Sequence, residues 1–246
     1  VVRGHPNASW EVAPGLTQTI VPRTLAHADA DDRIGAEARL PVTDILSGLH
    51  ADRTPAYGAA LRHAAADADL VLLAEPYLLP AVLAADLDVP MLYDAYNVEA
   101  SLKEGALPES AVRTWLLDRV RSIERAAVTE SAAITTCSDD DARDLAARYG
   151  RSRASFTVVP NGTEVLAEVP SPEERRALGL EWRRRFRRSA STPMPDGLAV
   201  FFGSWHPPNL DAAELIAEVA AEVPEVLFLS CGGHGDAFRD RIVPPN

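Results

Sequence analysis

The sequence predicts an α/β protein of two domains, each with a parallel sheet, and three observations support this prediction. Short apolar runs recur along the 246 residues, and helical patterns separate them. The runs are apolar on both faces, which is typical of parallel strands in an α/β fold. A segment rich in proline and arginine then interrupts the alternation. We therefore predict a first domain over residues 1–165, a linker over 166–196 and a second domain over 197–246.

The elements follow from apolar periodicity and from capping residues. Residues 1–60 give no clear period, so no element is assigned there. One helix is predicted from a single apolar face, formed by Val112, Leu116, Val120, Ile123 and Ala127. Another is predicted over residues 139–149, with Ser138 as its N-cap and Gly150 as its stop. The predicted strands cover residues 70–74, 90–94, 133–137, 156–159, 198–202 and 226–230.

The predicted linker carries its own helix signal. Ser171 is followed by a proline and, three residues later, by Glu174, which is the pattern of a capping box with proline at the first helical position. The arginine-rich stretch 183–188 in the same segment has two interpretations. It is either a solvated helix face, which we favour, or a surface that contacts anionic lipid.

Composition limits the classes of function. Asp and Glu number 36 against 24 Lys and Arg, which gives a formal net charge of -12. Such a charge repels a phosphate backbone, so nucleic-acid binding is not expected. The two cysteines are too few for a disulfide framework, and the six histidines show no metal-ligand spacing, so we expect them in surface or turn positions. With no signal peptide and no long apolar run, a cytoplasmic location is expected, and peripheral membrane contact stays open.

Polar residues follow the predicted strands of the first domain, where a parallel sheet binds its ligands. Asp94 ends the strand at 90–94, Asn97 and Glu99 follow it, and Glu75 comes after the strand at 70–74. Two carboxylates and an amide in one loop suit the binding of sugar hydroxyls or the transfer of a proton. The alternative is that they are ordinary turn and first-turn residues. Other strands end at Ser138 and Asn161-Gly162, which also suit a cap and a turn.

Glycines follow the two strands predicted in the second domain. In "AVFFGSWHPPNLDAA", Gly203 would let a backbone approach a ligand, and a helix starting near Asn209 would offer N–H groups to an anion. The alternative is a tight turn with Asn209 as an ordinary N-cap. Gly232 and Gly233 repeat the arrangement after the next strand, where a simple turn is again the alternative.

The order and spacing of four motifs carry a resemblance. "YDAYNVE", "ITTCSDDDARDL", "VVPNGTEV" and "VFFGSWHPPNLDAA" together resemble bacterial and archaeal glycosyltransferases of the family-4-like, B-type fold, over about residues 65–246. The resemblance implies two Rossmann-like domains that face each other across a cleft. It also implies an acceptor, a glycan or a lipid-linked molecule, on the first domain and a nucleotide-sugar donor on the second. Transfer would retain anomeric configuration, without a bound metal or another cofactor.

The resemblance assigns roles to residues of this chain. Tyr96 stands where the family often has histidine, which separates this chain from the common pattern. The residues expected to be catalytic are Asp94, Tyr96 and Glu99. The residues expected to bind the acceptor are Glu75, Asn97, Ser138, Asn161 and Gly162. The residues expected to bind the donor are Gly203, Ser204, Asn209, Gly232 and Gly233.

Both ends of the chain depart from the family pattern. The family's opening strand and glycine loop are not found at the start, and its donor-domain helix with paired glutamates is not found before Asn246. We therefore expect a fragment of a glycosyltransferase whose second domain is incomplete, which binds nucleotide-sugar weakly or not at all and which is inactive by itself. The alternative is a non-catalytic nucleotide-binding or interaction module of the same fold.

Overall fold

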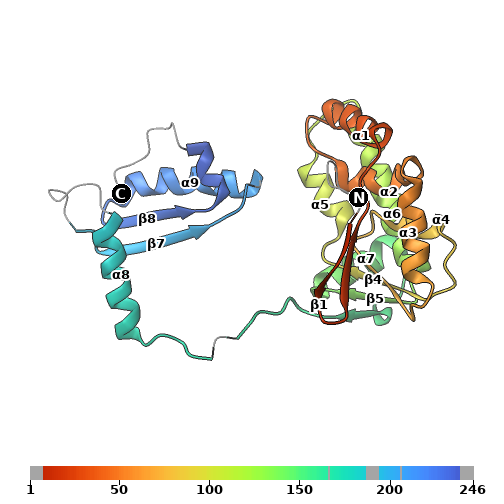
Figure 1. Cartoon of the computed structure of the whole chain (residues 1–246). Helices are drawn as coiled ribbons and strands as arrows, with labels where there is room; N and C mark the ends of the chain where they lie inside the picture. Colours follow the sequence, from red (N-terminus) through yellow and green to blue (C-terminus); the bar gives the residue numbers. More distant parts are fainter. Residues whose placement is uncertain (1–7, 166, 187–193, 206, 239–246) are drawn as a thin grey trace. The chain divides into compact units, whose positions relative to one another are not determined.

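The chain forms two compact units in a computed structural model, which describes residues 8–165, 167–186, 194–205 and 207–238 (Figure 1). The first unit covers Val1–Thr163 and the second covers Glu164–Asn246. Both contain parallel strands separated by helices, which confirms the predicted α/β class. No helix among the described residues is both long and apolar enough to span a membrane.

The first unit is built on a four-stranded parallel sheet with the order β3-β4-β5-β6. Neighbouring strands pair in register, so that Ala74 lies opposite Asp94, and Asp94 lies opposite Thr135. All four strands were predicted from their apolar runs, and they differ from the prediction by one residue at most at each end. Their bounds are Val71–Ala74, Met91–Ala95, Ala133–Thr136 and Phe156–Val158.

Helices α6 (Arg113–Glu130) and α7 (Asp139–Tyr149) pack on one face of this sheet. Tyr93 and Ile134 point from the strands into that core and are fully buried. The opposite face is more open in the described part of the chain, where Leu72 on β3 is 57% exposed.

A second apolar core lies among the helices of the first unit. Ile45, Leu46 and Leu116 are fully buried in it, together with Tyr77 and Ala100. Helices α1, α2 and α5, which the sequence did not reveal, contribute to this core together with α6. The other elements that were not predicted lie elsewhere in the unit. The bounds of all the elements that were not predicted are Ala8–Ala13 (β1), Leu16–Ile20 (β2), Leu25–Ala38 (α1), Thr43–Leu49 (α2), Ala51–Arg53 (η1), Pro55–Ala65 (α3), Leu79–Ala84 (α4), Glu99–Ala106 (α5) and Arg153–Ser155 (η2).

The second unit pairs β7 with β8 in parallel, as the apolar runs predicted. Helix α8 occupies part of the segment predicted as a linker, and Ser171 and Glu174 form its capping box through reciprocal hydrogen bonds of 2.7 and 3.2 Å. Arg183 near its end donates to the carbonyl oxygens of Pro195 and Asp196, so α8 belongs with β7. The bounds are Pro172–Phe186 (α8), Gly197–Phe202 (β7), Pro207–Glu222 (α9), Val226–Cys231 (β8) and Gly233–Phe238 (η3).

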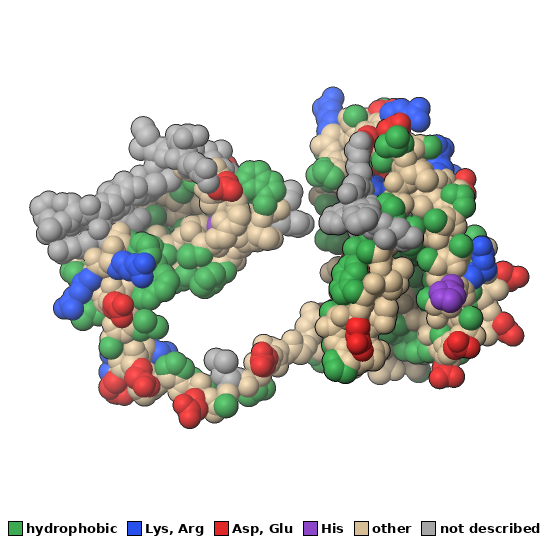
Figure 2. Space-filling model, in the orientation of Figure 1, with side chains coloured by type: hydrophobic (Ala, Val, Ile, Leu, Met, Phe, Trp, Pro, Cys, Tyr) green, Lys and Arg blue, Asp and Glu red, His purple; other side chains and the backbone are tan. Residues whose placement is uncertain are grey.

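Helix α8 is rich in charged residues of both signs. Acidic residues occupy its first turn and three arginines occupy its last turn, with Arg175, Arg176 and Glu181 between them, and Figure 2 shows both red and blue side chains along the helix. This order complements the helix dipole. None of its described residues is fully buried, which fits the interpretation as a solvated helix face, while Arg187 and Arg188 lie outside the described residues.

Candidate active site

Four loops of the first unit leave the sheet at the same edge, because its four strands are parallel and in register. The carboxyl ends of parallel strands are where open α/β sheets bind ligands. The sequence-predicted residues of this unit lie on these loops or just after them, in two groups that the contacts define.

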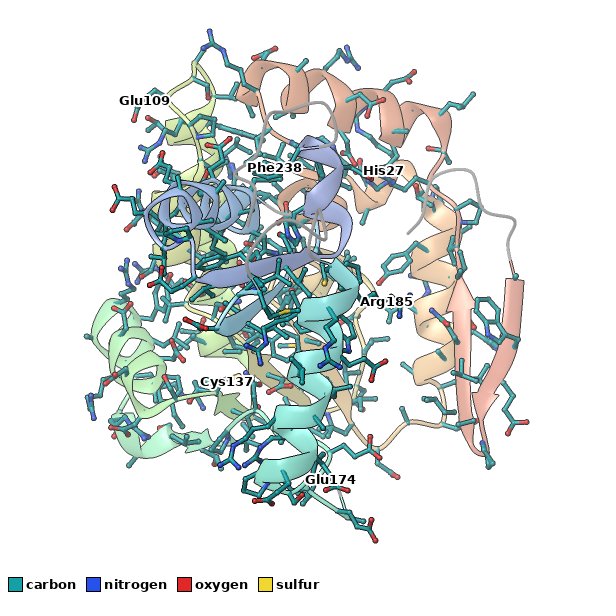
Figure 3. The ribbon with its side chains drawn as sticks, turned by 90° about the vertical axis from the view of Figure 1, so that its left-hand side faces the viewer. His27, Glu109, Cys137, Glu174, Arg185 and Phe238 are labelled. Carbon is teal, nitrogen blue, oxygen red and sulfur yellow. The ribbon has the colours of Figure 1, made fainter. Side chains whose placement is uncertain are left out.

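The first group joins the ends of β4, β5 and β6. The hydroxyl of Thr135 donates to Oδ1 of Asp94 across the sheet. The thiol of Cys137, labelled in Figure 3, donates to Oδ1 of Asn161 over 3.3 Å. Burial raises the pKa of Cys137, and the charges of Asp94 and Asp141 raise it further. Asp94 and Asn161 therefore each contact the end of β5 at this edge.

Ser138 follows β5 and begins α7. Its Oγ accepts from the backbone N–H of Asp141 over 3.1 Å, and its hydroxyl donates to the Asp141 carboxylate. The N-cap predicted for this helix is confirmed, and so is the stop at Gly150, which has a φ of 71°. Gly162 is exposed, and an added Cβ would meet nothing within 4 Å. Roles of Ser138 and Gly162 in acceptor binding stay predictions.

The second group surrounds Glu99, the first residue of α5. The Glu99 side chain is buried, and its carboxylate accepts hydrogen bonds from the Tyr77 hydroxyl and, over 3.4 Å, from Nδ2 of Asn97. Burial raises the pKa of Tyr77, as do its hydrogen bond to Glu99 and the charge of that carboxylate. Tyr96 lies beside them in the sequence but is 45% exposed.

Glu75 lies close enough to this group for the charges of the group to change its pKa. Its backbone is left-handed, with a φ of 66°, which is rare for a residue other than glycine. Desolvation raises the pKa of Glu75, and the charges of Glu99 and Asp44 add to the increase, while Lys103 opposes it. Lys103 itself forms an ion pair with Asp44 and lies 5.4 Å from the centre of the Tyr77 ring. Carboxylates thus outnumber cations around Glu75.

The predicted donor residues lie together in the second unit, where the loops after β7 and β8 interlock. The N–H of Gly203 donates to the carbonyl of Cys231 over 3.0 Å, and its carbonyl accepts from Nδ1 of His234 over 2.6 Å. Gly232 has a φ of 122°, and a Cβ there would lie 2.0 Å from the Gly203 oxygen. Internal packing therefore requires Gly232 to be glycine whether or not a donor binds.

Two sequence expectations in this region are wrong. Asn209 is not an N-cap, because α9 begins at Pro207, and its Nδ2 instead donates to the carbonyl of Ser204 over 3.1 Å. His234 is fully buried, as is His27 on α1, so these histidines do not occupy surface positions. Gly233 is exposed beside Trp205, and an added Cβ there would lie 3.4 Å from the Trp205 nitrogen.

For several residues of the site, the sequence alone does not distinguish a role in the site from a role in packing. Tyr77, Lys103 and Asp44 come from segments with no recognised motif. Glu124 is fully buried on the apolar face predicted for α6, four residues after Val120 and three before Ala127, and this spacing could have marked it. No group of three or more His, Cys, Asp or Glu residues among those described is arranged to bind a metal ion.

A parallel sheet with polar loops gathered at its carboxyl edge defines an α/β domain of the kind that binds ligands at this edge, and comparison with known proteins gives its family. The family model of the glycosyl transferase 4-like domain matches residues 8–162, more than half of the chain. The chain therefore belongs to this glycosyltransferase family, as the four motifs predicted.

Curated relatives agree with this assignment. D-inositol 3-phosphate glycosyltransferases of Mycobacterium bovis and Mycobacterium tuberculosis are each 27% identical to this chain over 149 residues. The match covers 59% of this chain and 27% of each relative. The chain thus corresponds to about a quarter of the length of these proteins.

Proposed function

We propose that this chain contributes the acceptor-side domain of a glycosyltransferase that transfers a sugar from a nucleotide diphosphate-sugar to a glycan or a lipid-linked acceptor. The observation that carries the proposal is that the family match, residues 8–162, coincides with the unit whose sheet edge gathers Asp94, Asn97 and Glu99. Retention of anomeric configuration and independence from metal are part of the proposal through the family resemblance.

Asp94 is the residue that this geometry best suits for contact with an acceptor hydroxyl. Thr135 bonds to Oδ1 and thereby fixes the carboxylate, and Oδ2 has no hydrogen-bond partner among the described residues. A carboxylate oxygen of this kind accepts a hydrogen bond from a sugar hydroxyl and orients it toward the anomeric carbon. Glu99 is less suited to contact, because Tyr77 and Asn97 already bond to its buried carboxylate.

In the proposed reaction, an acceptor hydroxyl oxygen bonds to the anomeric carbon of the donor sugar. The bond from that carbon to the diphosphate breaks, the nucleoside diphosphate leaves with the electron pair, and the hydroxyl proton passes to an oxygen of the departing diphosphate. The donor side is assigned to the loops that contain Gly203, Ser204, Asn209, Gly232 and Gly233. Their position after two parallel strands supports this assignment.

The test compares two Asp→Asn variants in the whole protein, one at each end of β4. Asp94→Asn changes the carboxyl edge, and Asp88→Asn makes the same change at an exposed residue before the strand. Transfer is measured as nucleoside diphosphate release with a panel of nucleotide-sugars and with polyol, glycan and lipid-linked acceptors. We expect Asp94→Asn to lower kcat/KM by about a hundredfold or more, and Asp88→Asn to change it by about twofold at most.

Two results would contradict the proposal. Equal activity of the two variants would remove Asp94 from the site. If no sugar donor is used while nucleotides alone bind, the chain is better described as a non-catalytic nucleotide-binding module of the same fold.

A further inference from the structure

A buried carboxylate lies under the loop that carries the proposed acceptor site. Glu124 belongs to α6, and its side chain is fully buried on the face that packs into the core. Burial raises its pKa, because the charged form is desolvated, while its hydrogen bonds act in the opposite direction. A buried carboxylate is costly unless hydrogen-bond donors surround it, so its partners show what it does in the fold.

The partners of Glu124 are the first two amides of α5 and a tyrosine of α7. Its Oε1 accepts from the N–H of Glu99 over 2.6 Å, and its Oε2 accepts from the N–H of Ala100 over 3.2 Å. The hydroxyl of Tyr149 donates to Oε2 over 2.5 Å. One carboxylate therefore connects three helices at the point where α5 begins.

Glu124 replaces the capping side chain that α5 does not have. The residue in the N-cap position is Val98, whose side chain cannot accept a hydrogen bond. The amides of Glu99 and Ala100 are buried and would be left without partners, which is unfavourable. A carboxylate from α6 satisfies both amides and places negative charge at the positive end of the helix.

These contacts hold both the backbone and the side chain of Glu99 in place. Its backbone N–H is bonded to Glu124, and its carboxylate is bonded to Tyr77 and Asn97. The loop over residues 96–98 is therefore held at its far end by α6 as well as by β4 at its near end.

We propose that Glu124 is a positioning residue of the glycosyltransferase: it orients the acceptor-side loop through α5 without touching the substrate. This inference rests on the proposed function for its link to activity, but its structural part can be tested separately. The structural part is that the start of α5 depends on the Glu124 carboxylate, and this can be wrong whether or not the proposed function is right.

The structural test is hydrogen exchange at two amides. Glu124→Gln keeps the shape of the side chain but turns an NH₂ group toward N–H or O–H donors. We expect the amides of Glu99 and Ala100 to exchange about tenfold faster or more, while amides of β4 and β5 keep their protection. The matched control is Glu130→Gln, the same change at an exposed residue of α6, which should leave all of these rates unchanged. Unchanged rates at Glu99 and Ala100 in Glu124→Gln would overturn the proposal.

A milder variant keeps the proposal falsifiable if Glu124→Gln does not fold. Tyr149→Phe removes the hydroxyl that holds Oε2 of Glu124 in place, while the carboxylate stays available to both amides. We expect it to fold and to speed exchange at Ala100, which shares Oε2 with Tyr149, more than at Glu99. Equal protection of both amides in Tyr149→Phe and in the unaltered protein would count against the network.

The kinetic test uses the donor and acceptor pair that the transfer assay turns over. A positioning role predicts that Glu124→Gln raises the acceptor KM by about tenfold with little change in the donor KM, whereas a general loss of stability would lower the active fraction without this split. Faster amide exchange with an unchanged acceptor KM would overturn the link to acceptor binding. If exchange accelerates in a protein that transfers no sugar, the proposed function fails while the capping role stands.

Discussion

At the scale of single residues, carboxylates of the same sheet edge have different environments. Glu99 is buried and bonded to Tyr77, Glu75 is exposed on a left-handed backbone, and Asp94 is half-buried with one oxygen bonded to Thr135. The sequence presents all three as acidic residues after strands, so it could not rank them. The ranking depends on which hydrogen-bond donors the fold brings to each carboxylate.

A glycine-to-alanine substitution, which adds one methyl group, tests how closely the loops after β7 and β8 pack against each other. Gly232→Ala places a Cβ 2.0 Å from the Gly203 oxygen on a backbone with a φ of 122°, so we expect a loss of about 2 kcal/mol or more. Gly235→Ala is the matched control, because its Cβ would meet nothing within 4 Å and should change stability by about 0.5 kcal/mol at most. Hydrogen exchange of the β7 and β8 amides measures both. Equal protection in the two variants would show that the close approach is not required.

At the scale of elements, α7 and α5 begin in different ways. Ser138 caps α7 from within its own sequence, whereas α5 takes its cap from Glu124, twenty-five residues further along the chain. A local cap is visible in a sequence and a tertiary cap is not. This difference explains why α7 was predicted with its bounds and α5 was not.

The local cap of α7 makes a definite prediction. Ser138→Ala removes the acceptor for the Asp141 amide, and we expect the free energy of unfolding to fall by about 1 kcal/mol. Ser155→Ala, an exposed serine at the end of η2, is the control and should be nearly neutral. Urea denaturation measures both. If the two variants are equally stable, the Ser138 hydroxyl is free for the acceptor role that the family resemblance assigns to it.

The same contrast shows what the sequence could predict more generally. Apolar runs located all six parallel strands because a buried strand needs consecutive apolar residues whatever its neighbours are. Helices α1 and α3 were not predicted because alanine and charged residues dominate them and few large apolar residues mark a face, whereas α2 was not predicted because seven residues are too few to show a period. The polar edge of the sheet was predictable from strand ends, but its internal partners Tyr77 and Glu124 required the tertiary structure.

At the scale of the whole molecule, an exposed segment connects the two compact units (Figure 1). Residues 159–165 and 167–170 form no helix or strand, and their side chains are exposed. Exposed chain without regular structure is the preferred substrate of proteases.

Limited proteolysis should therefore separate the units. A glutamyl endopeptidase is expected to cut first after Glu164 or Glu168, which are exposed in this segment. Glu130 is also exposed but lies at the end of α6, so cleavage there should be slower. Mass spectrometry of early fragments identifies the sites. Early cleavage at Glu130 in preference to the connecting segment would contradict the division into units.

The interlocked loops of the second unit have a mechanical consequence. Gly203 bonds to Cys231 and His234, and Gly232 lies against its carbonyl, so neither loop can shift without displacing the other. The His234 ring, whose other nitrogen bonds to the Ser230 hydroxyl, links the pair to β8. A ligand that displaces one of these loops must therefore displace the other as well. We expect the ends of β7 and β8 to move together when a ligand binds at either loop.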